Sequence, residues 1–276
     1  MLVARRLTGR AVTPAERRLR RRLEGLGASN PPKRRPGELW REWVNRPLRD
    51  GVEVERAVSE VTGCGLPVHA DAPKNWDLLV ALGTILERTG TGASVLEMGA
   101  PRYSMLLPWL YLYGYRRLVG IDLAHEGSAQ VGPIRYLKMD LTATSFADAA
   151  FEAIACLSVI EHGVSFESYL REASRLLKPG GVLVTSTDFW CEPVDTQGQI
   201  AYGTPIRIFT RDDMEACAAF AQKCGLRLVR SFEFTCAERV VHWAGHDLDY
   251  TFINFVLEKD AANGRSSMRR LLARRG

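Results

Sequence analysis

The sequence lacks any long apolar run. No stretch approaches the roughly 20 residues that a membrane-spanning helix requires, and Arg5, Arg6 and Arg10 interrupt the hydrophobic segment near the N-terminus. We therefore expect no membrane span and no secretory signal.

Cysteine is scarce and shows no pattern. The six cysteines form no Cys-x-x-Cys pair and have no histidine partner at zinc-ligand spacing, so we expect no metal site. All six are expected to be reduced thiols in a cytoplasmic protein. Cys217 and Cys224 follow a helical apolar stripe, which indicates packing rather than metal binding.

Acidic residues are few at the N-terminus. Residues 1–50 hold 14 Arg and Lys against 5 Asp and Glu, a local charge of +9, whereas the whole chain has +5 and the remainder therefore −4. Such a basic arm can contact RNA, an anionic membrane surface or an acidic partner. The alternative is a solvated, arginine-rich helix and linker.

Composition divides the chain into four segments. A charged helix is expected over 14–26, and the three prolines of Ser29 to Glu38 then break regular structure. The expected segments are a basic, flexible extension (1–37), a helical cover leading into the core (38–90), a main domain (91–260) and a basic C-terminal tail (261–276).

After Gly90, short apolar runs alternate with helical segments, which is typical of a mostly parallel sheet covered on both faces. Helices are expected from Phe166 to Leu177 and after the Thr210–Asp213 capping box. The predicted strands lie within 94–99, 117–123, 134–141, 151–160, 181–187, 226–234 and 250–259. The predicted fold is α/β, a Rossmann-like, seven-stranded, mostly parallel, doubly wound sheet with an N-terminal helical extension.

Acidic residues lie at or near the carboxyl ends of three successive predicted strands. The first strand ends in Glu97-Met98-Gly99, the second in Asp122 and the third in Asp140. Ligands bind at the carboxyl ends of the strands in such sheets, and a carboxylate in the second position can accept both hydroxyls of a ribose. NAD-binding and S-adenosylmethionine-binding proteins share this arrangement.

With these strand ends, the runs Phe151 to His162 and Leu176-Leu177-Lys178-Pro179-Gly180-Gly181 complete an ordered set of motifs. In this order and spacing the chain resembles the class I S-adenosylmethionine-dependent methyltransferases over roughly residues 75–259. The resemblance implies S-adenosylmethionine as cofactor and methyl transfer as activity. A dehydrogenase is the distant alternative, because Pro101 and Ser104 occupy the later glycine positions of the dinucleotide fingerprint.

The resemblance also implies roles at the cofactor. Glu97 would lie near the methionine amino group, Asp122 would bind the ribose hydroxyls, Asp140 the adenine amine, and Ser158 would line the floor. The alternative is that Glu97 or Ser158 only organises its loop. The full expected cofactor-binding set is Glu97, Gly99, Ala100, Asp122, Leu123, Asp140, Leu141 and Ser158.

The glycine-rich turn departs from the family pattern. Gly99-Ala100-Pro101-Arg102-Tyr103 keeps only the first glycine of the usual Gly-x-Gly-x-Gly. Proline has no amide hydrogen, so the backbone at 101 cannot donate to a cofactor. Gly99 and Ala100 are expected to make more of the approach.

His162 is the candidate catalytic base, since an imidazole titrates near neutral pH. A structural histidine is the equal alternative. The long loop after the fifth strand supplies Asp188, Trp190 and Tyr202, which are candidates for contacting a polar, sugar-like or amine-bearing acceptor. The alternative for each of them is loop packing.

The sequence lacks one motif that would indicate a nucleic-acid acceptor. Leu157 to His162 replaces the Asn/Asp-Pro-Pro-aromatic run that is typical of methyltransferases acting on base amines, so nucleic acid is disfavoured as a partner. The predicted acceptor is a small molecule, such as a sugar or a natural-product intermediate. Two alternatives stay open: a non-catalytic protein that keeps the fold, and an RNA methyltransferase that uses the basic arm.

Overall fold

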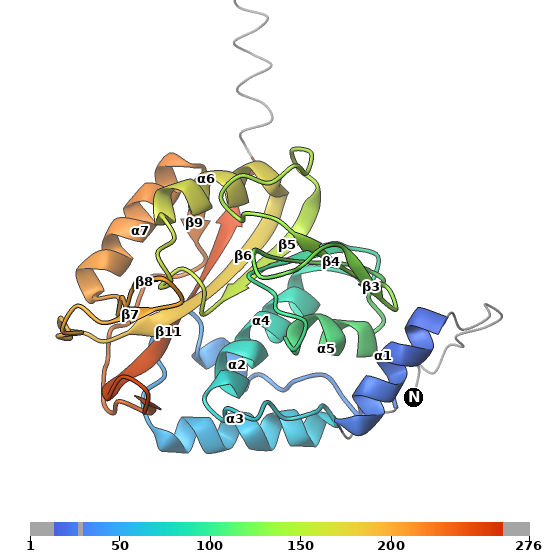
Figure 1. Cartoon of the computed structure of the whole chain (residues 1–276), viewed down its shortest axis with the longest axis horizontal. Coiled ribbons are helices and arrows are strands. Elements are labelled where there is room, and N and C mark those ends of the chain that lie inside the picture. Colours follow the sequence, from blue (N-terminus) through green and yellow to red (C-terminus); the bar gives the residue numbers. More distant parts are fainter. Residues whose placement is uncertain (1–13, 27–29, 262–276) are drawn as a thin grey trace, which may run out of the picture.

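The computed structural model describes residues 14–26 and 30–261 (Figure 1). The first 13 residues of the expected extension and the expected tail from residue 262 onward lie outside the described residues. The helices are α1 (Pro14–Gly25), α2 (Leu39–Glu42), α3 (Gly51–Cys64), α4 (Lys74–Arg88), α5 (Leu106–Leu112), α6 (Phe166–Leu176) and α7 (Arg211–Lys223). Within these described ranges, no helix is long and apolar enough to cross a membrane.

One large sheet runs through the molecule in the order β10-β11-β6-β5-β1-β2-β4-β3, and β9 pairs with β11. The central neighbours β6, β5, β1, β2 and β4 are all parallel, whereas β11 is antiparallel to β6. The strands are β1 (Ser94–Met98), β2 (Arg117–Asp122), β3 (Ala129–Val131), β4 (Ile134–Lys138), β5 (Phe151–Leu157), β6 (Leu177–Phe189), β9 (Leu226–Leu228), β10 (Val241–Trp243) and β11 (Leu248–Lys259). The predicted mostly parallel α/β fold is confirmed.

The strand count differs from the expected seven. The short strands β3 and β10 extend the sheet to nine strands, each by pairing antiparallel with the neighbour that follows it in the chain. Their runs of three residues are too short to give a recognisable period. A separate two-stranded hairpin joins β7 (Ile200–Ala201) to β8 (Thr204–Pro205).

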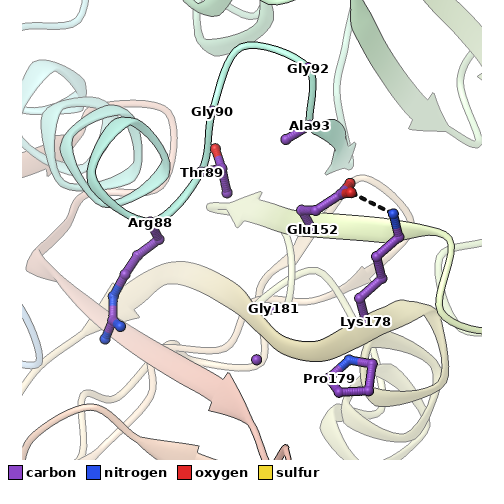
Figure 2. Close-up of a pocket in the computed structure, with 10 residues that line it drawn as sticks. Arg88, Thr89, Gly90, Gly92, Ala93, Glu152, Lys178, Pro179 and Gly181 are labelled. Atoms are coloured by element: carbon purple, nitrogen blue, oxygen red, sulfur yellow. Dashed lines mark hydrogen bonds and ion pairs between the residues drawn. The ribbon is translucent and has the colours of Figure 1, made fainter.

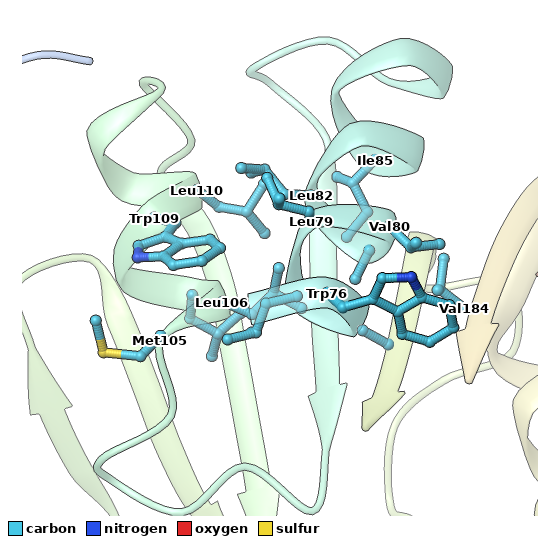
Figure 3. Close-up of a cluster of buried hydrophobic side chains, with 14 of the residues drawn as sticks. Trp76, Leu79, Val80, Leu82, Ile85, Met105, Leu106, Trp109, Leu110 and Val184 are labelled. Carbon is cyan, nitrogen blue, oxygen red and sulfur yellow. The ribbon is translucent and has the colours of Figure 1, made fainter. Parts of the chain in front are cut away.

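Helices α4 and α5 cover one face of the sheet. Leu79 and Leu82 of α4 lie beside Leu110 of α5, whereas the Trp76 ring of α4 lies beside Val184 of β6 (Figure 3). Almost all of α4 is buried, because α2 and α3 cover its outer side. The apolar spacing in the sequence predicts one buried face, whereas the helix is buried nearly all round.

Helices α6 and α7 cover the other face (Figure 1). The predicted capping box is present: the Asp213 amide donates to the Thr210 hydroxyl, and the Asp213 carboxylate accepts from the Thr210 amide. Cys217 is buried on the inner side of α7, as expected for a packing residue. Helix α6 begins at the Ser165 cap and ends before β6.

Two local expectations were wrong. Helix α1 was expected outside the core, but Leu19 and Leu23 are buried in the same cluster as α4. The predicted strand over 226–234 ends at Leu228, and the chain after it runs without regular pairing.

The connection between β4 and β5 contains no helix in the described chain. A loop joins the two strands, and Arg175 of α6 donates to the carbonyl of Phe146 in this loop.

The expectation that all six cysteines are free thiols was also wrong. Cys191 and Cys236 form a disulfide that joins the loop after β6 to the segment before β10. The two residues are 45 positions apart, so their pairing depends on tertiary structure and has no local sequence signal. The other four cysteines are free.

Candidate functional site

The three acidic strand ends lie side by side. Glu97 of β1 is in register with Gly120 of β2, and Asp122 of β2 is in register with Lys138 of β4, two residues before Asp140. Because these strands are parallel neighbours, their carboxyl ends meet at one edge of the sheet. The predicted row of carboxylates along this edge is therefore present in the fold.

The turn after β1 is tight. Gly99 has φ +69°, and a Cβ at this position would lie 2.3 Å from Val159 Cγ2, so only glycine fits there. The Ala100 amide donates to the Ile121 carbonyl at 2.9 Å. Since Pro101 has no amide hydrogen, neither Ala100 nor Pro101 offers a free backbone donor in this structure.

Glu97 is buried at the end of β1. The Ser104 hydroxyl donates to Glu97 Oε1 at 2.5 Å, while Oε2 is buried without a partner among the described residues. Burial raises the pKa of Glu97 to about 7, against the lowering effects of the Ser104 hydroxyl, the Lys74 ammonium and the nearby Leu107 amide. A cationic ligand would find here a carboxylate with one unused oxygen.

Asp122 and Asp140 both bind their own turns. The Ala124 amide donates to Asp122 Oδ1 at 2.7 Å, and the Thr142 amide and hydroxyl donate to Asp140 Oδ1. Each Oδ2 is left without a partner in the described part of the chain. Asp122 is half-buried and Asp140 is exposed.

Apolar side chains flank this row of carboxylates unequally. Leu123 is 63% exposed and Tyr103 is 74% exposed, so both can cover a flat ligand. Leu141, the other expected cofactor-contacting leucine, packs into the core on the α6 side of the sheet.

A buried polar cluster lies beneath the end of β5. Lys74, at the start of α4, donates to Ser158 Oγ at 2.7 Å and to Asp77 Oδ2 at 2.5 Å, and the Ser186 hydroxyl donates to the same Asp77 oxygen. Lys74, Asp77 and Ser186 were not predicted from the sequence as site residues. One signal was present: a lysine in the first turn of a helix is opposed by the helix dipole, which suggests a specific partner.

The ends of β5 and β6 bring two further acids together. Asp188 interacts with Glu161 and with the Tyr250 hydroxyl, and the Thr187 hydroxyl donates to Glu161 Oε2 at 3.0 Å. Burial raises the pKa of both Glu161 and Asp188. Asp188 was predicted to face an acceptor, but it lies almost wholly buried as a partner of Glu161, a residue the sequence analysis did not select.

His162 and Tyr202 meet above this pair. Their ring centroids are 4.8 Å apart, and the Tyr202 ring stacks on Trp243 at 6.4 Å. Tyr202 is 81% exposed at the turn of the β7–β8 hairpin. Burial and the Lys74 charge lower the pKa of His162, so the neutral imidazole prevails at pH 7.

Trp190 differs from the other candidate acceptor residues. Its ring packs against the core on the α4 side, and the Arg239 guanidinium lies over it at 4.6 Å. This arrangement agrees with the loop-packing alternative for Trp190.

A pocket lies away from this site. It has a volume of about 450 Å³ and opens at the opposite edge of the sheet, where β1, β5 and β6 begin (Figure 2). Its rim carries Thr89 and the ion pair of Lys178 with Glu152. Ligands of such sheets bind at the carboxyl edge, so this pocket is not the cofactor site.

The residues at the carboxyl edge suit S-adenosylmethionine. The unpartnered Glu97 Oε2 can accept from an ammonium, and the free oxygen of Asp122 can accept from ribose hydroxyls. Leu123, directly after β2, and Tyr103, in the turn after β1, leave most of their side chains exposed.

Comparisons with known proteins agree with this geometry. A family model described as a methyltransferase domain matches residues 96–185. The [4+2]-cyclase SpnF shares 16% identity with a TM-score of 0.50 over 75% of this chain and 93% of its own, which shows the fold. The Burkholderia thailandensis 1,6-didemethyltoxoflavin-N1-methyltransferase shares 19% identity with a TM-score of 0.47, over 67% of this chain and 76% of its own. No curated protein matches the sequence.

The domain match covers the strands that carry Glu97, Asp122 and Asp140 and extends into β6. The strand order is that of a doubly wound sheet with its switch point between β1 and β5. Residues 96–185 are therefore similar to a methyltransferase domain, and they lie within a Rossmann-like α/β fold.

Proposed function

We propose that this protein transfers the methyl group of S-adenosylmethionine to a small-molecule acceptor. The observation that carries the proposal is the position of two carboxylates on adjacent parallel strand ends: Glu97, with a buried Oε2 that has no partner in the described chain, and Asp122, which uses only Oδ1 to accept from the Ala124 amide. These carboxylates suit the two polar ends of the cofactor, its methionine ammonium and its ribose. Asp140, one strand further, is proposed to face the adenine amine.

The acceptor is proposed to lie on the other side of the switch point, beyond the ends of β5 and β6. Tyr202 exposes its ring there beside His162, and both are held by contacts with other rings. A long loop above strand ends is a common substrate-binding element. Tyr202 would contact the acceptor directly, whereas Asp188 would act through Glu161 and Tyr250.

When bound, the cofactor supplies an electrophilic methyl group, so the protein mainly has to align the acceptor and exclude water. His162 is proposed to accept the proton that a hydroxyl or ammonium acceptor releases, at one nitrogen of its neutral imidazole. Its lowered pKa favours this role at neutral pH.

The first test is calorimetric titration with S-adenosylmethionine and S-adenosylhomocysteine, with NAD as a control. Saturable binding of the first two alone supports the proposal. Binding of NAD, or of none of the three, contradicts it. Incubation with methyl-labelled cofactor and separate pools of small metabolites and RNA then identifies the acceptor class, and label found in RNA would replace the small-molecule proposal.

A non-catalytic protein with this fold is the second candidate. One observation favours it: Ala100 and Pro101 offer the cofactor no backbone donor, because the first amide is bonded to Ile121 and the second does not exist. The cyclase SpnF, which has this fold, is named for a reaction other than methyl transfer. This candidate predicts no detectable affinity for S-adenosylmethionine, so saturable binding of the cofactor would contradict it.

A further inference from the structure

Lys74 occupies an unfavourable position for a cation. It is the first residue of α4, where the helix dipole favours negative charge. Its side chain is only 15% exposed, so the ammonium is largely removed from water as well. Because both the helix dipole and the loss of hydration destabilise the charged ammonium, Lys74 needs partners that compensate for them.

The Lys74 ammonium has two hydrogen-bond partners, which leave one of its N–H donors unused. The ammonium has three N–H groups; one bonds to Asp77 Oδ2 and another to Ser158 Oγ. The Phe252 ring covers one flank at 4.9 Å from Nζ. No third hydrogen-bond acceptor for Lys74 is found among residues 14–26 and 30–261.

The bond to Ser158 places Lys74 at the cofactor side of the site. Ser158 follows β5, the strand next to β1, and adopts φ +52°, a strained conformation for serine. The Lys74 charge also lowers the pKa of Glu97, so the ammonium and this carboxylate lie close enough to interact. Both charges thus lie near the place assigned to the methionine end of the cofactor.

The methionine end of S-adenosylmethionine carries both an ammonium and a carboxylate. Glu97 offers a partner for the ammonium only. A carboxylate that enters a site containing Glu97, Asp77 and Glu161 needs a cation, because burying an unpaired anion among other anions is costly.

We propose that Lys74 binds the carboxylate of the cofactor's methionine through the N–H that Asp77 and Ser158 leave unused. Lys74 and Glu97 then form a matched pair of charges that fixes the amino-acid end of the cofactor in one orientation. This inference rests on the proposed use of S-adenosylmethionine.

The competing interpretation is that Lys74 only neutralises Asp77. Asp77 does accept from Lys74, but it also accepts from the Ser186 hydroxyl and still has a buried oxygen, Oδ1, without a partner. A neutralising lysine would affect stability and would not distinguish one cofactor analogue from another.

The experiment compares S-adenosylmethionine with decarboxylated S-adenosylmethionine, which keeps the ammonium and the sulfonium and lacks only the carboxylate. Calorimetry gives both affinities for the wild type and for Lys74→Met, Lys74→Arg and Glu97→Gln. We expect the wild type to prefer the carboxylated form by about 10- to 100-fold, the range of a hydrogen bond between charged groups. Lys74→Met should lose this preference and Lys74→Arg should retain most of it, whereas Glu97→Gln should weaken both ligands and keep the preference.

Lys178→Met is the matched control, because Lys178 pairs with Glu152 at the opposite edge of the sheet and should leave both affinities unchanged. If Lys74→Met does not fold, the double variant with Asp77→Asn removes both charges of the buried pair and is measured instead. A folded variant without Lys74 that still prefers the carboxylated form would overturn the inference. Failure of the wild type to bind S-adenosylmethionine would instead overturn the proposed function.

Discussion

The pKa of Glu97 gives the proposed cofactor site a specific pH dependence. Burial raises this pKa to about 7, and the side chain keeps one unpartnered oxygen. A bound ammonium stabilises the carboxylate form, so the complex has a lower Glu97 pKa than the free protein. Binding below pH 7 must therefore release a proton, and the affinity must rise with pH up to about 7.

The magnitude follows from the ionised fraction. With a pKa of about 7, Glu97 is half ionised at pH 7 and about one-tenth ionised at pH 6. If only the carboxylate form binds, S-adenosylhomocysteine should bind about fivefold more weakly at pH 6 than at pH 7. About half a proton should be released per ligand at pH 7. Above about pH 8 the ligand's own ammonium begins to deprotonate, so the useful range ends there.

The assay is calorimetry in two buffers of different ionisation enthalpy, which counts the released protons directly. Glu97→Gln should bind more weakly at pH 7 and should show neither the fivefold change nor the proton release. His162, Glu161 and Asp188 titrate in the same protein, and the variant separates their contribution from that of Glu97. An affinity that does not change between pH 6 and pH 7 in the wild type, or a pH slope that persists in Glu97→Gln, would refute the reasoning.

Three further predictions concern other parts of the fold. Asp122→Ala should weaken S-adenosylhomocysteine binding by about 10- to 100-fold without unfolding the protein, since a hydrogen bond to a charged group is worth about 1.5–3 kcal/mol; unchanged affinity in a folded variant would show that the ribose lies elsewhere. Gly99→Ala should lower the free energy of unfolding by ~2–4 kcal/mol, because φ is +69° and Val159 fills the space of a Cβ; a denaturant midpoint equal to that of the wild type would contradict this packing. Thiol titration of the unfolded protein should find four reactive groups without reductant and six with it, and six in both cases would exclude the Cys191–Cys236 bond.

The sequence predicts the sheet well because its signals are local. Each central strand is a short apolar run, and each acidic residue that ends a strand is adjacent to that run, so the row from Glu97 to Asp140 follows once the strands are parallel neighbours. The Thr210 capping box is equally local, since its two bonds join residues three positions apart.

The missed features depend on contacts between distant segments. Lys74 meets Ser158 across 84 positions, and Asp77 meets Ser186 across 109. No periodicity relates such pairs. The hydrogen bond from the Ala100 amide to the Ile121 carbonyl is also not predictable from the sequence, because it depends on how closely the turn after β1 approaches β2. The sequence therefore indicates which strand ends carry chemistry, but not which buried groups support them.

Helix α4 shows why the helical segment before the sheet belongs to the site. Trp76, in its first turn, and Leu79, in its second, are buried against the sheet, which fixes the height and direction of the helix above β5 and β6. Its first turn then has to place Lys74 and Asp77 at the carboxyl edge, because the burial of the following residues leaves the helix no freedom to slide or rotate. The position of α4 on the sheet thus determines both its apolar packing and the hydrogen bond from Lys74 to Ser158. A substitution such as Leu79→Ala, remote from any ligand, should loosen this placement and weaken cofactor binding along with stability. A variant that loses stability but keeps full affinity for S-adenosylhomocysteine would show that the first turn of α4 is positioned independently of the core.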